Sequence, residues 1–327
     1  MSTQFLRFCS AVAGVALLLV FSGSAQADFT DYFNAVMADG PEAYWSFEDG
    51  DTGDILNGTA AADNTGNHPG TYMGQGSDGP QLTAAHLGFG GNAAHFARTD
   101  SANGDFVLFD TLGDVGGNID NNGVTFEFLF KNQQPDPSAA NRLFGVWNSR
   151  PDGNAESQVS FGIQDLQERF GGPGDSFFLR EEGGAAWSYI VKPRPQQNIN
   201  DGDWHHVAMV VNPGVPADNA TIIYVDGEPG RIIPAIDVFA PKALMDFANY
   251  DKEFIIGGDH IHNGTKRQFL IDAMVDEFAV YSKALSASEV KAHCLATNIV
   301  CVPEPASVVI LTLGAITMLG MGGRKRW

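Results

Sequence analysis

Oxygen-bearing side chains gather at three places along the chain. These are Glu48-Asp49-Gly50-Asp51, Asp63-Asn64-Thr65-Gly66-Asn67, and Asp272 with Asp276-Glu277. Calcium takes about six to eight oxygen ligands from carboxylates, amides, carbonyls and water, so each stretch could contribute to a calcium site. The same residues also have an ordinary local use. Asp63 and Asn67 can form Asx turns, while Asp276 and Glu277 can cap loop amides or face solvent.

Carboxylates can also hydrolyse a glycosidic bond, for which two of them must be held at a fixed separation. The acids that share one expected strand are Asp272, Asp276 and Glu277, and only Asp272 and Asp276 share a face. This is fewer than a row of acids facing one groove. We therefore expect no catalytic residue and no enzyme, with a carbohydrate-active hydrolase as the less favoured alternative.

Histidine and aromatic side chains offer weaker candidates. His205 and His206 are neighbours on an expected strand, so they point to opposite faces and do not form a ligand pair. We expect at least one of them to be a hydrogen-bonded core histidine. Trp147, Trp187, Tyr189 and Tyr250 lie near loops, where they would either stack on sugar rings or pack inside the protein.

Short strands separated by turn-rich spacers must position these residues. Val124, Phe126, Phe128 and Phe130 alternate with polar neighbours, and this period of two is typical of antiparallel strands. The expected strands are 43–47, 93–96, 105–109, 124–131, 143–147, 158–164, 177–180, 188–191, 204–211, 221–225, 254–256 and 270–281. A short helix precedes them at 28–38, and Ser286-Ala287-Ser288-Glu289 forms a capping box for a last helix that reaches Cys294. The pattern predicts an all-β antiparallel sandwich with long loops at 50–91 and 113–123.

Six motifs resemble, in order, the laminin-G-like, concanavalin A-like jelly-roll family. They are Ala43-Tyr44-Trp45-Ser46-Phe47, Asp63-Asn64-Thr65-Gly66-Asn67 with Gly70-Thr71-Tyr72, Thr125-Phe126-Glu127-Phe128, Trp204-His205-His206-Val207-Ala208, Tyr224-Val225-Asp226-Gly227, and Val275-Asp276-Glu277-Phe278-Ala279-Val280-Tyr281 leading to Ala284-Leu285-Ser286. The resemblance implies two packed sheets, a concave face and often a calcium ion at the rim. It also implies that the loop after the first strand meets the last long strand, so that Asp63, the Asn67 backbone and Asp276 would share the ion.

The N-terminal residues have the layout of a cleavable signal peptide. Arg7 precedes an apolar run from Phe8 to Phe21, and small residues end in Ala25-Gln26-Ala27, so we expect cleavage after Ala27. A buried N-terminal helix is the alternative. Cleavage would remove Cys9 and leave Cys294 and Cys301 in an oxidising compartment. There we expect these two to form a disulfide that ties the last helix to the exit strand.

The C-terminal residues resemble PEP-CTERM sorting signals. Val302-Pro303-Glu304-Pro305 is followed by an uncharged span, Ala306 to Gly323, and then by Arg324-Lys325-Arg326. The span would reach about 27 Å as a helix, close to the thickness of a hydrocarbon core of about 30 Å. The resemblance implies processing by an exosortase-type membrane protease. A permanent single-span membrane anchor is the alternative, and the basic cluster would keep the domain outside in either case.

The net charge of the chain limits the classes of partner. The chain has 39 Asp and Glu against 19 Lys and Arg, with a formal net charge of −20, which argues against nucleic acid or anionic membrane surfaces as partners. We expect a signal peptide (1–27), a short N-terminal helix (28–40), a jelly-roll domain (41–301) and a sorting tail (302–327) with a transmembrane span (306–323). The expected function is a noncatalytic extracellular binding or adhesion module in the cell envelope or biofilm matrix. Its partner would be a polysaccharide or a surface protein, and a structural matrix protein without a specific ligand is the alternative.

Overall fold

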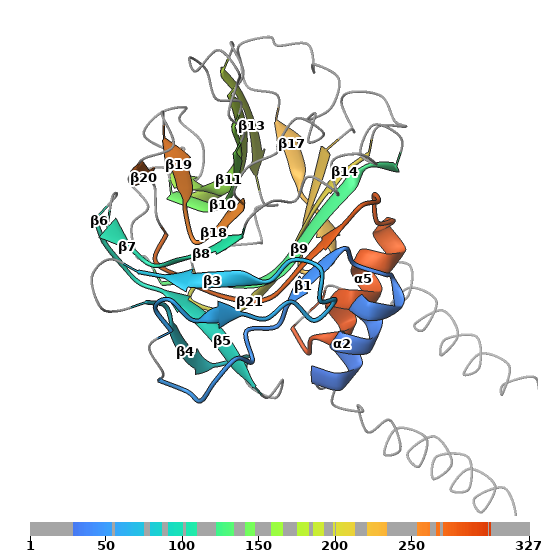
Figure 1. The fold of residues 1–327 in the computed structure, drawn as a ribbon. Helices are drawn as coiled ribbons and strands as arrows, with labels where there is room; N and C mark the ends of the chain where they lie inside the picture. Colours follow the sequence, from blue (N-terminus) through green and yellow to red (C-terminus); the bar gives the residue numbers. More distant parts are fainter. Residues whose placement is uncertain are drawn as a thin grey trace, which may run out of the picture.

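The structure is a computed structural model, shown in Figure 1, in which two antiparallel sheets pack face to face. It describes residues 29–53, 56–74, 79–86, 91–100, 103–109, 122–133, 141–147, 158–165, 175–182, 186–192, 199, 201–212, 221–233, 254–261, 266–268, 271–299 and 301. The predicted signal peptide, the sorting tail with its span 306–323, and most of the loop 113–123 lie outside these residues. No helix among the described residues is both long and apolar enough to cross a membrane.

One sheet has eight strands, in the order β16-β15-β14-β9-β21-β5-β4, with β1 paired to β21. Its strands are β1 (Ala43–Trp45), β4 (Gln81–Ala84), β5 (Asn92–Phe96), β9 (Val124–Asn132), β14 (His205–Val211), β15 (Thr221–Val225), β16 (Glu228–Pro229) and β21 (Ala273–Tyr281). The last strand of the chain, β21, therefore lies between β9 and β5 in the middle of the sheet.

The other sheet has nine strands, in the order β17-β13-β12-β11-β10-β18-β8-β3-β2. Its strands are β2 (Ala60–Ala61), β3 (Gly70–Met73), β8 (Phe106–Phe109), β10 (Asn141–Trp147), β11 (Gln158–Asp165), β12 (Asp175–Glu182), β13 (Ala186–Lys192), β17 (Arg231–Ile233) and β18 (Phe254–Ile256). Two small hairpins complete the strands. They are β6 (Arg98–Asp100) with β7 (Asn103–Gly104), and β19 (Asp259–Ile261) with β20 (Lys266–Gln268).

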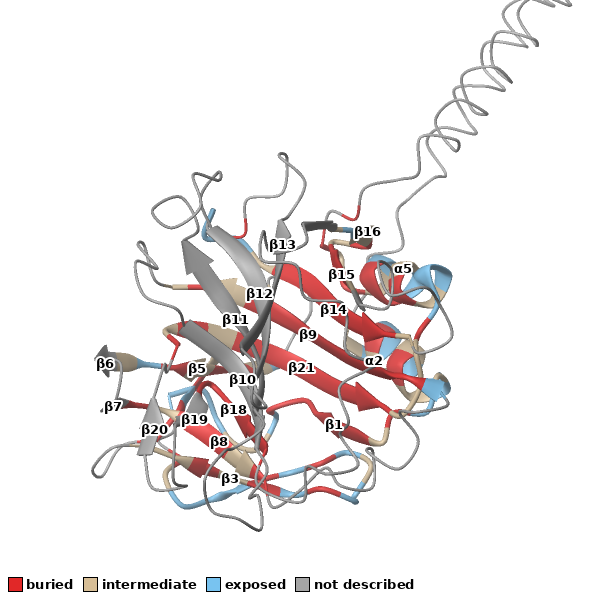
Figure 2. Cartoon of the chain, turned by 90° about the horizontal axis from the view of Figure 1, so that it is seen from above, coloured by how far each residue is buried: buried red, intermediate tan, exposed pale blue. Residues whose placement is uncertain are grey.

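The core fills the space between the sheets. The alternating phenylalanines of β9 join it, and Phe128 stacks on Phe278 of β21 with ring centroids 5.2 Å apart. Trp45 lies against Phe109 and Phe254 of the other sheet, with centroids 4.1 and 5.9 Å away. As Figure 2 shows, nearly all residues of β9, β14 and β21 are buried.

Two helices, α2 (Phe29–Ala38) and α5 (Ala287–Ala296), cover the outer face of the eight-stranded sheet (Figure 1). Tyr32 and Val36 of α2 and Val290 of α5 form a second buried cluster with the outward residues of that sheet. The predicted capping box is present: Ser286 Oγ accepts from the Glu289 amide at 3.2 Å, and the Glu289 carboxylate accepts from the Ser286 amide at 2.6 Å. Both helices were predicted, and α5 runs two residues beyond the expected end at Cys294.

The antiparallel sandwich and most of the predicted strands are confirmed, but the interpretation of 50–91 as one long loop is wrong in part. This stretch contains β2, β3 and β4. Gly70, which lies in the expected loop, is needed inside β3, because a Cβ atom there would lie 2.2 Å from the Phe109 ring. A glycine in a strand often marks such a close approach, which sequence patterning alone does not separate from a turn.

Candidate functional site

The acidic pair of β21 lies at an irregularity in the sheet. The register of β21 against β9 shifts between Asp276 and Ala279, and Glu277 has a φ of 55°. Both carboxyl groups are fully buried. The Tyr44 hydroxyl donates to Glu277 Oε2, and the Glu277 amide donates to Asp276 Oδ1 at 2.9 Å. Asp276 Oδ2 and Glu277 Oε1 have no hydrogen-bond partner among the described residues.

This burial controls the charge of the pair. Burial raises the pKa of Asp276 well above its ordinary value, and the negative charge of Glu48 raises it further. Burial also raises the pKa of Glu277. Glu48 follows β1, and its Oε1 accepts from the Asn92 amide at 2.7 Å. A second carboxylate beside a buried one disfavours ionisation of both, unless a cation lies between them.

Asp63 is engaged differently, because backbone amides surround its carboxylate. Oδ1 accepts from Tyr44 and Thr65 at 2.8 and 3.0 Å. Oδ2 accepts from Asn67 and His68 at 2.8 and 2.7 Å, and from the Thr65 hydroxyl at 2.6 Å. This is the loop-capping role that the sequence left open as the alternative to metal binding.

The predicted calcium set is Asp63, the Asn67 backbone and Asp276, and both carboxylate oxygens of Asp63 already accept hydrogen bonds. Nowhere in the described part of the chain do three or more His, Cys, Asp or Glu side chains come together in a way that could hold a metal ion. Of the two carboxylates in the predicted set, Asp276 is the one that keeps an oxygen without a hydrogen-bond partner among the described residues. Its charged neighbour is Glu48 rather than Asp63. Calcium therefore stays a prediction.

The two neighbouring histidines point to opposite faces, as predicted. His205 lies near the sheet end, with Nδ1 2.9 Å from Asp226 and Nε2 3.1 Å from Asp201. Burial alone would lower the pKa of His205, but these two carboxylates outweigh it and raise the pKa. His206 points toward the helices, where its Nε2 lies 2.6 Å from Glu127 Oε1.

Glu127 is a site that sequence reasoning missed. It lies on β9 facing the helices and is fully buried, and His293 of α5 also contacts it, at 2.9 and 3.0 Å. In the sequence, Glu127 is one of the polar residues that alternate with the phenylalanines of this strand, and it was given no role of its own. The signal that could have found it is the presence of the two helices, α2 and α5, at the two ends of the domain, because they can cover the face of β9 that carries Glu127.

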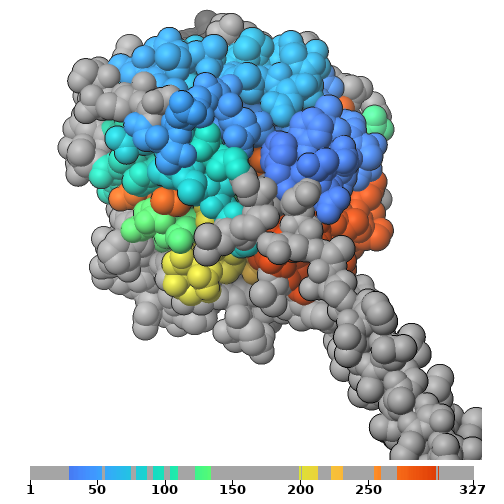
Figure 3. Space-filling view, turned by 90° about the horizontal axis from the view of Figure 1, so that it is seen from below, coloured from blue at the N-terminus to red at the C-terminus, as the bar shows by residue number. Residues whose placement is uncertain are grey.

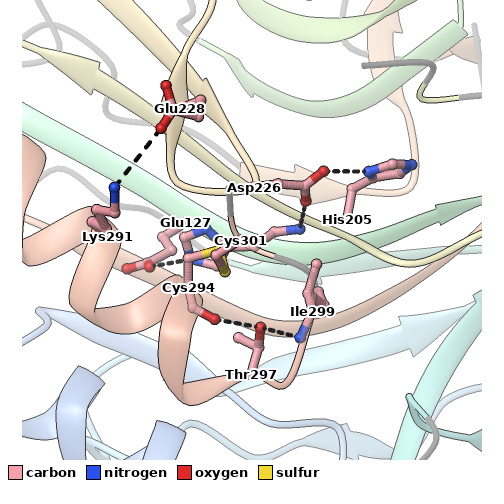
Figure 4. The surroundings of a disulfide bond; sticks show 10 residues. Glu127, His205, Asp226, Glu228, Lys291, Cys294, Thr297, Ile299 and Cys301 are labelled. Carbon is pink, nitrogen blue, oxygen red and sulfur yellow. Dashed lines mark hydrogen bonds and ion pairs between the residues drawn. A yellow bond between two sulfur atoms is a disulfide. The ribbon is translucent and has the colours of Figure 1, made fainter. Parts of the chain in front are cut away.

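The disulfide lies beside this region. Cys294 and Cys301 are bonded as predicted, with Cα atoms 6.1 Å apart. Figure 4 shows its surroundings, where Lys291 reaches Glu228 at 3.8 Å and Asp226 contacts His205. A Cβ atom at Gly227, in the turn after β15, would lie 3.4 Å from Cys294 Cβ, so this turn packs against the bridge.

The outer face of the nine-stranded sheet is different, because neither α2 nor α5 covers it (Figure 1). Phe106 and Ile255 are buried there, and Met73 and Leu108 pack against them while remaining half-buried. Cross-strand pairing places Leu108 between Thr71 and Ile255. The side chains of Trp147, Trp187 and Tyr189, on neighbouring strands, and all of Tyr250 lie outside the described set.

The packed antiparallel sheets define a concanavalin A-like jelly roll. A laminin-G family model of the concanavalin A-like lectin/glucanases superfamily matches residues 101–291. The chain belongs to this family, as the sequence resemblance predicted. A search of the curated proteins found no match.

Several solved structures are similar to this chain at low sequence identity. A crystal structure of a receptor binding domain is 11% identical, with a TM-score of 0.51, and the match covers 82% of this chain and 53% of that one. Domain 4 of AbnA, an extracellular arabinanase from Geobacillus stearothermophilus in complex with arabinotriose, is 18% identical over 78% of this chain and 98% of that one, with a TM-score of 0.47. A Trypanosoma rangeli sialidase is 14% identical over 81% and 34%, with a TM-score of 0.43.

Proposed function

We propose that this chain is an exported, noncatalytic binding module that recognises extracellular polysaccharide through the outer face of the nine-stranded sheet. The observation that carries the proposal is the apolar patch of Met73, Phe106, Leu108 and Ile255 on that face. The helices α2 and α5 pack on the opposite side of the sandwich. Within the patch, Met73 and Leu108 are partly exposed, whereas Phe106 and Ile255 are buried. Apolar side chains on a sheet surface suit the apolar faces of sugar rings.

The acidic residues favour binding over hydrolysis. A glycosidase needs carboxyl groups that reach the substrate. Asp276 and Glu277 are fully buried, and Asp272, although half-exposed, lies 3.2 Å from His95. The acids that suggested a hydrolase are therefore better suited to supporting the fold. The predicted export signal and sorting tail would direct the proposed module to the envelope or matrix, which supports polysaccharide as its proposed partner.

Binding is tested with the purified full chain and a panel of soluble extracellular polysaccharides, by affinity electrophoresis. Leu108→Asp places a charge in the patch, and Thr71→Arg adds a bulky cation beside it without removing apolar area. Leu295→Asp is the matched control, because Leu295 is 57% exposed on α5, on the other side of the molecule. The proposal expects saturable binding that both patch variants weaken with only a small change in melting temperature and that the control retains.

Other outcomes would replace the proposal. Absence of saturable binding by the wild-type chain would leave a structural matrix role without a specific ligand. Release of oligosaccharide products, lost in a folded Asp276→Ala variant, would identify a hydrolase instead.

A calcium ion is part of the proposal, with Asp276 and Glu48 as its side-chain ligands. The buried Asp276 Oδ2 lacks a partner, and the neighbouring Glu48 carboxylate repels it. Calcium would neutralise both groups, and carbonyl and water oxygens would complete its shell. Its contribution would be to stabilise the fold near the bulge of β21, with no part in chemistry.

The calcium proposal is tested by melting the full chain in millimolar calcium and in chelator. An ion bound only to the native state raises the melting temperature. The rise should be present in the wild type and in Asp272→Asn, a control at the start of the same segment, and absent in Asp276→Asn. Equal melting of the wild type in both solutions would remove calcium from the proposal.

A further inference from the structure

A buried cluster of polar side chains lies between the helices α2 and α5 and the eight-stranded sheet. Its centre is the carboxylate of Glu127, which is fully buried on the outer face of β9. His206 of β14 reaches Oε1 at 2.6 Å, and the Tyr281 hydroxyl of β21 donates to Oε2 at 3.0 Å. Three neighbouring strands thus meet at one negative charge.

His293 connects this charge to both helices. Its Nδ1 lies 2.9 Å from Glu127 Oε2, and its Nε2 lies 2.9 Å from Oδ2 of Asp39, the residue that follows α2. A neutral imidazole has one N–H, whereas the imidazolium has two. Because a carboxylate faces each ring nitrogen, the contacts require the protonated form of His293.

The groups that face His293 come from every element packed around it. They are Glu127 on β9, Tyr281 on β21, and Asp39 and Tyr32 on or beside α2. His206 on β14 contacts the same Glu127 and Tyr32. Lys283 completes this polar cluster, with Nζ 3.3 Å from Asp39 and 3.5 Å from Glu289 at the start of α5. Two carboxylates, Glu127 and Asp39, balance the imidazolium directly.

Separation of α2 and α5 from the sandwich would break no strand pairing of the two described sheets. The residues of α2 and α5 belong to a buried cluster distinct from the core between the sheets. Figure 3 shows the two helices side by side at one edge of the molecule. The disulfide does not join them to the sheet, since Cys294 and Cys301 are seven positions apart at the end of α5.

We propose that protonated His293 is a pH-dependent latch that fastens both terminal helices to the eight-stranded sheet through Glu127 and Asp39. When His293 loses its proton, one of its two carboxylate contacts loses its donor and Glu127 loses its counter-charge. The helices then open more often while the sandwich stays folded.

The direction of the pH effect follows from the charges. Burial alone would lower the pKa of His293, but Glu127 and then Asp39 outweigh burial and raise it. Burial alone would raise the pKa of Glu127, but the charge of His293 and hydrogen bonds from His206 and His293 outweigh burial and lower it to about 2. The latch is therefore complete below about pH 6.5, the ordinary value of histidine, and is lost as the pH rises through the folded-state pKa of His293.

The test is hydrogen exchange of the full chain, followed by mass spectrometry between pH 6 and pH 9 and corrected for the intrinsic pH dependence of exchange. Opening of α2 and α5 should increase by up to about tenfold for each pH unit above about 6.5, until His293 is deprotonated. Peptides from β9, β14 and β21 should keep their protection. The variant His293→Asn should open at every pH and lose the pH response of the helices.

His205→Asn is the matched control. His205 also lies between two carboxylates, Asp226 and Asp201, but it contacts neither helix. This variant should keep the wild-type pH response of α2 and α5. A pH response that disappears equally in both variants would overturn the proposal.

A second measurement keeps the proposal open to contradiction even if His293→Asn does not fold. Exchange of the imidazole C2 proton of His293, in the wild-type chain, reports its pKa directly. A pKa at or below the ordinary value of histidine would overturn the latch. So would helix exchange that is independent of pH, or strands that lose protection together with the helices.

Discussion

The helix-covered face and the open face of this sandwich use their outward side chains in opposite ways. On the eight-stranded sheet, α2 and α5 bury Glu127 together with two histidines and a tyrosine that contact its carboxylate. On the nine-stranded sheet, an apolar cluster near β8 has buried Phe106 and Ile255 packed against half-buried Met73 and Leu108. A covered face can hold charge only where partners are fixed, since an unpaired buried charge costs several kcal/mol. Changes on the helix-covered face should therefore alter stability. Changes on the open face should alter ligand binding.

The largest expected effect is on the covered face. Glu127→Ala would leave His293 and His206 buried without their shared carboxylate. We expect it to lower the free energy of unfolding by about 3–5 kcal/mol, the cost of breaking a buried pair by removing one partner. Urea unfolding at pH 6 would measure it. A loss below about 1 kcal/mol would mean that the network contributes little to holding the helices.

Removal of the disulfide should have a smaller effect. Replacing Cys294 and Cys301 together by serine frees a short loop, so the expected loss is about 2 kcal/mol. Because Cys294 also packs near Gly227, the turn after β15 should gain mobility along with the end of α5. Reduction of the wild-type protein is the control and should reproduce the loss. Unchanged unfolding in both cases would show that α5 is held by its buried contacts alone.

Ser286→Ala tests the start of α5. The hydroxyl of Ser286 accepts from the Glu289 amide, and removal of such a cap costs about 1 kcal/mol. The neighbouring Ser288→Ala, inside the first turn, serves as the control and should change stability by less than half as much. If both variants unfold like the wild type, the fraying of α5 does not limit the stability of the two helices.

The smallest effect on stability is expected on the open face. Leu108 is half-buried, so Leu108→Asp should lower the free energy of unfolding by no more than about 1 kcal/mol while it weakens polysaccharide binding. Parallel unfolding and binding measurements on one preparation would check this. A large loss of stability with unchanged binding would reverse the assignment of the two faces.

Sequence patterns within single helices and strands predicted those individual elements. The alternation of Val124 to Phe130 predicted β9, and the Ser286 capping box predicted the start of α5, because each pattern depends on neighbours within one element. The role of Glu127 could not be obtained in this way. Its partner His293 is 166 positions away, and only the packing of α5 on the sheet brings the two together.

The candidate metal residues show the same limit. Asp63 suits either a calcium ion or a loop cap by its type alone, and the choice depends on where the amides of Tyr44, Asn67 and His68 point. Asp276 has a buried Oδ2 without a hydrogen-bond partner among the described residues, and its role as a calcium ligand stays a prediction. Its charged neighbour, Glu48, lies in an oxygen-rich stretch that the sequence had marked, but periodicity does not reveal which of these stretches meet in space.

The position of β21 has a consequence for the order of events during synthesis. This strand is the last in the chain, yet it lies between β9 and β5, and the partner of Glu127 follows it in α5. A nascent chain that ends before β21 lacks the middle of its sheet and cannot close its core. Contacts between such distant segments form slowly and only after β21 has been synthesised. For a chain predicted to be exported, this delay keeps the polypeptide open enough to be threaded through a translocation channel.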